Sequence, residues 1–274
     1  AYDLLTVDAK AELTAEKALL DSLLVEIEIQ EATLAVEIAE SSHLQTDFNT
    51  AQALVTALPS STEKIDLQDR LDALQGIIDA EAASSVDDLI TAIPASGAII
   101  LSNQAQIEAA RTAYDALTTA QQLFVLYEAV LTSAENELAA LQVATAAVVI
   151  AEGSNLQTDL DAAQALVTAL PNGTAKTDLQ NRLNAVQDII DVGLAQTIII
   201  NYFAANDVIV SRLNSNTIKA TAFTAKANEI VSSLGVTVSI TNTITVTRND
   251  ATYTISIVKN AATISMNIDV TFIR

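Results

Sequence analysis

The segment Ala51-Gln52-Ala53-Leu54-Val55-Thr56-Ala57-Leu58-Pro59 recurs without change from Ala163 to Pro171. We call the separation between Ala51 and Ala163 the repeat spacing. The match extends in both directions without a gap, and about two-thirds of positions 34–79 are identical to 146–191. Copies at a fixed spacing are typical of proteins built from similar structural units in series. The sequence therefore predicts an array of repeats and not one globule around a single active site.

Each copy has the pattern of a helical hairpin preceded by a third helix. Apolar residues from Leu44 to Leu58 recur at the spacing of one helical face. Pro59 ends this helix, Thr62 is placed to cap the next, and Pro171-Asn172-Gly173-Thr174 makes the same break in the second copy. With a third helix over 21–40 or 133–152, each copy is expected to form an up-down-up three-helix bundle.

Several helix starts are expected from side-chain caps. Residues 83–131 are expected to form a second kind of bundle, with a short helix ending near Pro94, one from Ser102 or Asn103 to about Leu117, and one from Thr118 to about Leu131. The serine or threonine followed three residues later by glutamine or glutamate is the capping-box pattern. It occurs at Ser42–Gln45, Ser154–Gln157, Thr118–Gln121 and Thr132–Glu135.

The pattern changes after residue 196. Two helices are expected over 198–213 and 219–234, and then apolar residues alternate with polar ones, which predicts a three- or four-stranded antiparallel meander packed on the helix around Phe223. The last strand, Thr263 to Ile273, is long, rich in threonine and nearly uncharged. Such an edge either completes its own sheet or pairs with another chain.

The predicted fold class is mainly α: tandem three-helix bundles forming an elongated arm, followed by a small α+β module with an antiparallel meander. The chain starts without Met, and the counterpart of residues 85–112 would precede residue 1. We therefore expect an excised or mature piece of a longer protein. The expected domains are the end of a truncated bundle at 1–20, bundles at 21–82, 83–131 and 132–195, and the α+β domain at 196–274.

Composition excludes several functional classes. The absence of cysteine excludes disulfides, thiol nucleophiles, cysteine zinc sites and iron–sulfur clusters. The net charge is −21, with −23 in residues 1–196 and +2 in residues 197–274. An acidic arm is a poor partner for nucleic acid or anionic lipid. We expect neither membrane insertion nor a signal peptide, because no apolar run approaches the ~20 residues of a span.

Few residues suggest chemistry. His43 is the only histidine, and Asn155 takes its place in the second copy, so we expect an ordinary exposed residue and no transition-metal site. Acids are numerous, but no loop has the ligand spacing of a calcium-binding hand, so a solvated acidic face is expected and a calcium site is the alternative. These acids include Asp66, Asp69, Asp72, Asp79, Asp159, Asp161, Asp178, Asp188 and Asp191.

Other residues that recur at the repeat spacing are expected to be structural. Arg70 and Arg182 share one repeat position, and Lys64 and Lys176 share another, so they are expected to pair with acids or to cap helix ends. Tyr2 and Tyr114 are expected in repeat cores. Asn172-Gly173-Thr174 matches a glycosylation acceptor, but a tight turn between helices explains it as well. Neither a G-x-S-x-G elbow nor a glycine-rich phosphate loop occurs in the sequence.

Two segments resemble helical repeats of Gram-positive bacterial surface proteins. Val86 to Pro94, followed by Ile107-Glu108-Ala109-Ala110-Arg111-Thr112-Ala113-Tyr114-Asp115-Ala116-Leu117-Thr118, resembles a repeat common in large surface proteins. Ala151 to Asp159, with 163–171 and 179–183, resembles a companion repeat of surface-layer and cell-wall-associated proteins and, more weakly, a helical segment in insecticidal crystal toxins. The resemblance covers about 1–195 and implies a spacer or scaffold without catalytic residues.

The function expected from these observations is that of a non-enzymatic, self-assembling segment of a bacterial surface-layer or cell-surface protein. Its expected partners are other copies or cell-wall components, and its expected location is extracellular. One alternative is an adhesin stalk that presents the terminal module to a glycan or a protein. A toxin component is a third class, and an enzyme is the class least favoured by the sequence.

Overall fold

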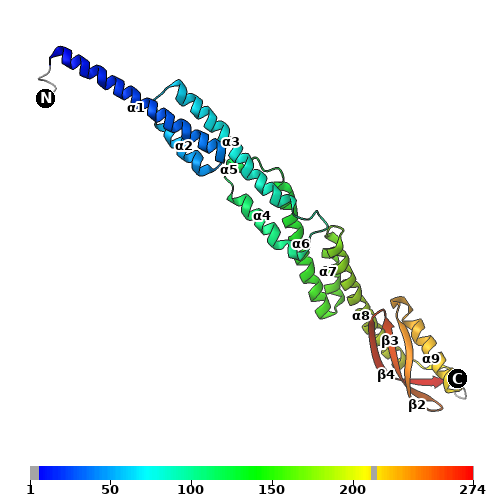
Figure 1. Cartoon of the computed structure of the whole chain (residues 1–274). Helices are drawn as coiled ribbons and strands as arrows, with labels where there is room; N and C mark the ends of the chain where they lie inside the picture. Colours follow the sequence, from blue (N-terminus) through cyan, green and yellow to red (C-terminus); the bar gives the residue numbers. More distant parts are fainter. Residues whose placement is uncertain (1–5, 211–214, 274) are drawn as a thin grey trace. The chain divides into compact units, whose positions relative to one another are not determined.

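The structure is a computed structural model that describes residues 6–210 and 215–273. It confirms a mainly α fold followed by a small α+β module (Figure 1). The chain divides into two compact units, which are described separately. The first comprises Ala1–Ile93 and Ala105–Thr132, and the second comprises Pro94–Gln104 and Ser133–Arg274.

The first unit contains the first copy of the bundle. It is formed by α1 (Val7–Ser42), α2 (Gln45–Ala57) and α3 (Thr62–Thr91). Small residues of α1 pack against larger ones of α2 and α3, which lets the helices approach closely. The fully or nearly fully buried core consists of Ala32, Val36, Ala39, Phe48, Ala51, Val55, Leu58, Leu67, Leu71, Leu74 and Ile78.

The second half of α3 packs with later helices of the same unit. These are α4 (Gln104–Ala116), which begins at the boundary of the unit, α5 (Thr119–Gln122), and the first turns of α6 (Glu128–Ser154). Buried Asp87 of α3 accepts hydrogen bonds from the N–H groups of Leu126 and Tyr127, at 3.0 to 3.1 Å. A carboxylate from a distant helix therefore satisfies the free amides at the start of α6.

The second unit contains the second copy of the bundle and the α+β module. The bundle is formed by α6, α7 (Gln157–Ala169) and α8 (Thr174–Ala205). Its core repeats the first one at the repeat spacing, with partly buried Ile190 in the place of Ile78, and consists of Leu141, Ala144, Val148, Ala151, Leu160, Ala163, Val167, Leu170, Leu179, Leu183 and Val186. A short 3-10 helix, η2 (Leu101–Asn103), belongs to this unit.

The module uses the second half of α8 as one of its two helices. Its other elements are β1 (Val208–Ile209), α9 (Asn216–Ile230), η3 (Ser232–Leu234), β2 (Thr237–Val246), β3 (Asp250–Lys259) and β4 (Ala262–Ile273). The strand order is β1-β4-β3-β2. One sheet face packs on α8 and α9 through a core that includes Ile199, Phe203, Phe223, Tyr253 and Phe272. The other face carries threonine, serine and asparagine.

Several expected element boundaries were wrong. Residues 20/21, 82/83, 131/132 and 195/196 lie inside α1, α3, α6 and α8, so these helices run through the expected domain limits. The helix expected from Thr118 ends at Gln122, because Asp87 supports a turn and a new start at Glu128. The helix expected over 198–213 is the end of α8 followed by β1, and residues 211–214 of that prediction lie outside the described part.

Most of the expected caps were also wrong in detail. The hydroxyls of Ser42 and Ser154 each accept from the N–H two residues later, and α2 and α7 begin without a side-chain cap. Ser61 caps α3 in place of Thr62. Thr132–Glu135 lies within α6. Only the Thr118–Gln121 capping box is confirmed.

The sheet also differs from the expected antiparallel meander, because its fourth strand, β1, pairs in parallel with β4.

Two helices meet the length and hydropathy of a membrane span, contrary to the expectation that no segment would. They are Glu128–Ser154 and Thr174–Ala205. Their apolar character comes largely from alanine, isoleucine and valine, and their inward faces form the cores of the second bundle and the module. The core helix of a bundle passes the same test as a membrane helix, so the observation is weak evidence for a membrane role.

Candidate functional site

The same arginine–glutamate contact joins the outer helices of both bundles. Arg70 donates from Nε and Nη2 to Glu40 at 2.9 and 2.7 Å, and Arg182 donates to Glu152 at 2.8 and 2.8 Å. These are bidentate, charge-assisted pairs. The hydrogen bond from the arginine lowers the pKa of Glu40 and of Glu152 below the ordinary carboxyl value. The expected pairing of the repeated arginines with acids is confirmed.

The repeated lysines close the loops of the two hairpins. Lys64 Nζ donates to the carbonyls of Thr56 and Leu58, both at 2.7 Å, and Lys176 Nζ donates to those of Thr168 and Leu170, both at 2.8 Å. A cation at these carbonyls satisfies acceptors that the end of a helix leaves free. The prediction that these lysines cap helix ends is therefore confirmed.

Glutamine pairs form a second repeated set of contacts. The amide of Gln52 bonds to Gln68 and that of Gln45 to Gln75, and the equivalent glutamines of the second copy make the same bonds. The backbone repeats as well. His43 and Asn155, which follow α1 and α6, both have left-handed conformations with φ of 53° and 52°. His43 also bonds through Nδ1 to Glu81 at 2.7 Å and is about one-third exposed.

A shallow groove lies between the outer helices of each bundle, and the two grooves are lined by equivalent residues. In the first copy it is lined by Ile29, Thr33, Thr62, Glu63, Asp66, Leu67 and Arg70. In the second copy, Leu141, Thr145, Ala175, Asp178, Leu179 and Arg182 line it, and Ile100, Leu101 and Ser102 are added. The second groove therefore has an extra wall, which the segment before α4 supplies.

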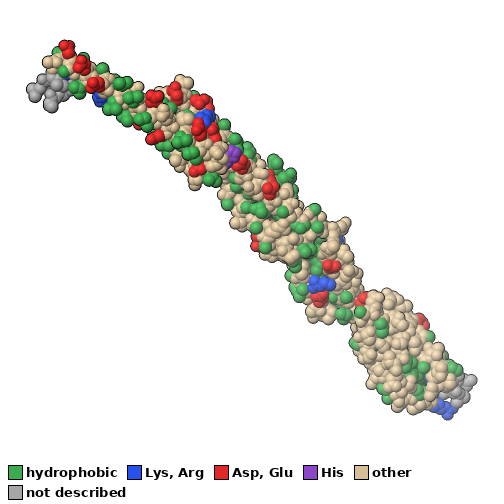
Figure 2. All heavy atoms as spheres, viewed as in Figure 1, with side chains coloured by type: hydrophobic (Ala, Val, Ile, Leu, Met, Phe, Trp, Pro, Cys, Tyr) green, Lys and Arg blue, Asp and Glu red, His purple; other side chains and the backbone are tan. Residues whose placement is uncertain are grey.

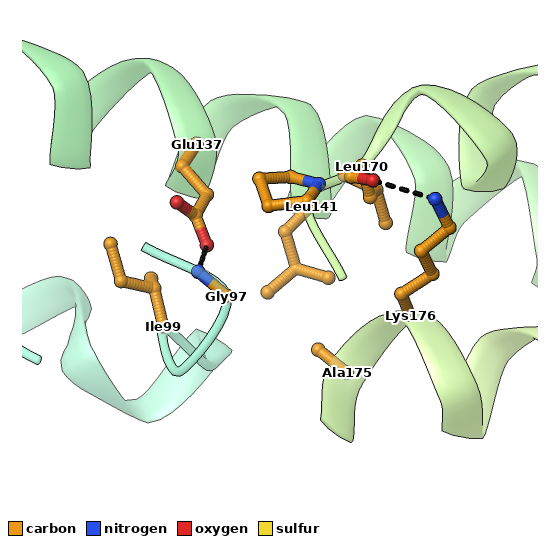
Figure 3. Close-up of a pocket in the computed structure, with 8 residues that line it drawn as sticks. Gly97, Ile99, Glu137, Leu141, Leu170, Ala175 and Lys176 are labelled. Atoms are coloured by element: carbon orange, nitrogen blue, oxygen red, sulfur yellow. Dashed lines mark hydrogen bonds between the residues drawn. The ribbon is translucent and has the colours of Figure 1, made fainter. Parts of the chain in front are cut away.

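This segment is fixed to the second bundle by a close backbone contact and by a hydrogen bond from Gly97 to Glu137 (Figure 3). Gly97 has φ of +84°, and a Cβ at Gly97 or at Gly173 would overlap the backbone of the other residue's loop. The N–H of Gly97 donates to the Glu137 carboxylate at 2.8 Å. The small cavity beside it has a volume of about 10 Å³, which is room for about one water molecule. The cavity is too small for a substrate.

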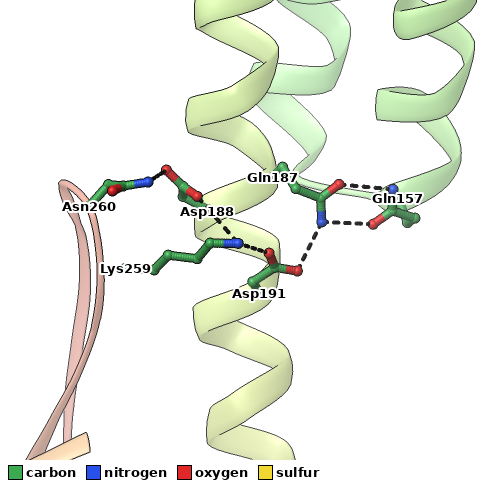
Figure 4. Close-up of polar contacts among 6 residues, drawn as sticks. All are labelled: Gln157, Gln187, Asp188, Asp191, Lys259 and Asn260. Carbon is green, nitrogen blue, oxygen red and sulfur yellow. Dashed lines mark hydrogen bonds and ion pairs between the residues drawn. The ribbon is translucent and has the colours of Figure 1, made fainter. Parts of the chain in front are cut away.

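A polar contact links α8 to the hairpin between β3 and β4 (Figure 4). Lys259 Nζ lies 2.5 Å from Asp191 Oδ2 and 3.5 Å from Asp188 Oδ1, and Asn260 Nδ2 donates to Asp188 at 2.8 Å. The bond to Asp191, with the nearby carboxylate of Asp188, raises the pKa of Lys259. Gln187 holds the other oxygen of Asp191. The module is thereby fixed to the bundle helix.

Several of the acidic residues accept hydrogen bonds from glutamines on the same helix. Asp79 accepts from Gln75, Asp72 from Gln68 and Asp161 from Gln157. Among residues 6–210 and 215–273, no group of three histidines or acids is placed to hold a metal ion. Arg111 lies over the half-buried ring of Tyr114 at 5.1 Å, whereas Tyr2 lies outside the described residues.

The buried polar side chains of the module include those of Lys219 and Tyr253. Lys219, only 2% exposed, donates to the carbonyls of Thr247 and Arg248 and so fixes the turn between β2 and β3. The hydroxyl of fully buried Tyr253 has no hydrogen-bond partner in the described part of the chain, and burial raises its pKa. The ring of Tyr253 stacks on that of Phe223, with 5.3 Å between the ring centroids. This arrangement is a packed core.

Sequence reasoning missed several residues that make tertiary contacts, among them Asp87, Gly97, Glu137 and Lys259. Asp87 and Glu137 are single acids among many, so nothing local distinguishes them. Gly97 could have been noticed, because the chain has only six glycines and this one lies in a loop where glycine is not needed to end a helix. Lys259 is recognisable only as one of the few bases in an acidic chain.

Comparison with known proteins gives one partial match. The minor extracellular protease Epr of Bacillus subtilis (strain 168) is 32% identical over 156 residues, which is 57% of this chain and 23% of that protein. The chain thus spans about a quarter of the curated relative's length. No family model matches the chain, and no solved structure matches it.

Proposed function

We propose that this chain is a non-catalytic structural segment of an extracellular bacterial protein, which serves as a spacer and self-associating scaffold at the cell surface. The observation that carries the proposal is the recurrence of tertiary contacts at the repeat spacing. The arginine pairs, lysine caps and glutamine pairs of the first copy recur in the second copy with the same geometry. Selection for the same packing in both copies is expected of a structural element.

The polar groups of the described chain are used to hold helices together. The lone histidine bonds to Glu81 on the bundle surface, and the hydroxyl of the adjacent Ser42 bonds to backbone groups. The grooves are shallow, and the arginines that line them, Arg70 and Arg182, make the repeated contacts with Glu40 and Glu152. The partial match to an extracellular protein agrees with an extracellular location. Because the match covers about a quarter of that protein, its protease activity is not transferred to this chain.

Removal of one full period tests the structural proposal directly. Deletion of residues 55–166 joins Leu54 to Val167 and keeps the local sequence of α2 and α7 intact. In the hybrid bundle, residues of the first copy would pair with the equivalent partners of the second copy. Glu40, for example, would pair with Arg182 in place of Arg70. We expect a folded, shorter protein that unfolds cooperatively, as measured by circular dichroism and denaturant titration.

Deletion of residues 55–164 is the matched control. It removes two residues fewer and rotates the helix face that follows by about 200°, because a helix turns about 100° per residue. We expect this variant to lose the bundle core. If both variants unfold, or both fold equally well, the modular interpretation is wrong.

Electron microscopy tests self-association and the role of calcium. Purified chain at increasing concentration is expected to form ordered sheets, filaments or discrete oligomers, and the same samples with calcium or with a chelator show whether the cation contributes. A chain that stays monomeric throughout contradicts the scaffold proposal and favours a stalk.

An adhesin stalk is the second candidate, and its binding surface would be the uncovered sheet face. This face carries hydroxyl and amide groups, including those of Thr252, Thr254 and Asn267. However, the aromatic rings that commonly stack on sugars are in the core, because Phe223, Tyr253 and Phe272 are fully buried. Glycan-array binding by the full chain, abolished by Thr254→Lys, would favour the adhesin.

A further inference from the structure

The outer edge of β4 is unpaired over most of its length. β1 pairs with β4 only at Phe272 and Ile273, together with one bond from Val210 N–H to the Ile273 carbonyl. Residues 262–271 pair with β3 on the inner side in an unbroken antiparallel register. In the described part of the chain, no hydrogen bond reaches the outer backbone groups of residues 263–269.

The register identifies which backbone groups face outward. Phe272 N–H donates to the Asn249 carbonyl, so even-numbered residues of β4 direct their backbone groups to β3. The odd-numbered residues therefore direct theirs outward, as Ile273 does toward β1. Thr263, Ser265, Asn267 and Asp269 thus present free donors and acceptors along a straight edge.

This edge lacks the protection found at the opposite side of the sheet. β2 has register shifts between Ile240 and Asn242 and between Thr243 and Thr245, and such bulges disrupt pairing with a further strand. β4 has no shift, no proline and one charged residue, Asp269. Ile264 and Met266 at this edge are only partly buried against the core. A neighbouring strand would cover both side chains.

We propose that β4 pairs with β4 of a second copy of this chain, antiparallel and across a twofold axis at Met266. In this register Thr263 faces Asp269 of the second copy and Ser265 faces its Asn267, so all four outward residues are paired. The edge is self-complementary, because Asp269 faces a threonine and not its own symmetry mate. Residues 197–274 carry a charge of only +2, so two modules repel each other weakly.

The inference deepens the proposed scaffold role by naming the self-association surface, and it rests on that proposal. The acidic bundles repel one another, so we expect the dimer to be favoured by salt, which screens exposed charges over about 10 Å at 0.1 M. β1 pairs with β4 only at Phe272 and Ile273, which lie outside the segment 263–269 that would form the interface.

Disulfide trapping tests the register, because the chain has no cysteine of its own. Met266 would face its symmetry mate in a non-hydrogen-bonded pair with Cα atoms about 4.5 Å apart, which is within the range of a disulfide. Full-length Met266→Cys is therefore expected to cross-link on mild oxidation. Thr263→Cys is the control. Position 263 faces position 269 of the second copy, so position 263 of that copy lies six residues further along the strand, about 20 Å away.

We expect Met266→Cys to cross-link at least about tenfold faster than Thr263→Cys, because only the first has disulfide geometry. Thr263 is the more exposed of the two, so collisional cross-linking would give the reverse order.

Ser265→Pro should abolish dimerisation measured by sedimentation and leave the circular dichroism unchanged, because the N–H it removes points outward.

The outcomes separate this inference from the proposed function. Oligomers that form without preferential cross-linking at position 266, or that persist in Ser265→Pro, overturn the β4 interface and leave the scaffold role standing. A chain that remains monomeric at all concentrations overturns both. Concentration-dependent dimers that cross-link at 266 and disappear in folded Ser265→Pro support the interface.

Discussion

The two bundles share their internal contacts and differ where each one borders another part of its unit. Position 61 is serine in the first copy and caps α3, whereas the equivalent Gly173 makes no cap and lets the loop at Gly97 approach. Position 76 is glycine, whereas the equivalent Asp188 bonds to Asn260 of the module. On the face shown in Figure 2, few charged side chains are seen over the second bundle. The comparison shows that the internal contacts are kept between copies, whereas boundary positions differ and contact particular neighbours.

The largest expected effect tests whether the two cores are equivalent. Leu71 and Leu183 occupy the same repeat position and are fully or almost fully buried. Leu71→Ala and Leu183→Ala should each lower the free energy of unfolding by about 2–5 kcal/mol, because each leaves a cavity. Hydrogen exchange should localise each loss to its own bundle. Losses that differ by more than about twofold would contradict equivalence of the cores.

The next effect tests the loop contact that only the second copy makes. Gly173→Ala forces a Cβ into the backbone near Gly97 and should cost about 1–3 kcal/mol, as overpacking does. Ser61→Gly at the equivalent position loses only a cap and should cost a few tenths of a kcal/mol. Denaturant unfolding of the two variants measures the contrast. Similar costs at the two positions would show that the contact between the loops contributes little.

A smaller effect tests the link between the second bundle and the module. Lys259→Met removes the partner of Asp188 and Asp191 and should cost about 1–2 kcal/mol, because the partly buried carboxylates keep only their amide donors. The raised pKa of Lys259 means that its contribution is fully present below the ordinary lysine value of 10.5 and is lost as pH rises through the higher folded value. Wild-type stability should therefore fall at strongly alkaline pH more than that of Lys259→Met.

The smallest effect tests the repeated arginine pairs. Arg70→Gln and Arg182→Gln should each cost about 0.5 kcal/mol, because the pairs are about one-third exposed and solvent screens them. The lowered pKa values of Glu40 and Glu152 mean that the contribution is present above 4.5 and is lost as pH falls through the folded values. The wild type and either variant should converge in stability under acid. A difference that persists at low pH would point to packing by the arginine stem.

The repeat made the helical hairpins predictable, because helical spacing and Pro59 or Pro171 are local signals. The arginine and lysine roles were also predictable, since two copies at one position indicate a shared contact. The turn at Leu123–Tyr127 was not predictable, because it depends on Asp87, which lies far earlier in the chain on α3. The same holds for β1, whose parallel pairing with β4 depends on how the chain after α8 returns to the sheet.

The position equivalent to Asp87 in the second copy is Ile199, which is fully buried in the module core. α8 therefore passes from the bundle into the module without a break, and Lys259 fixes the β3–β4 hairpin to it through Asp188 and Asp191. A pull on β4 would be carried into the helix by hydrophobic packing and the lysine contact together. The second unit is thus suited to bear tension as one mechanical piece.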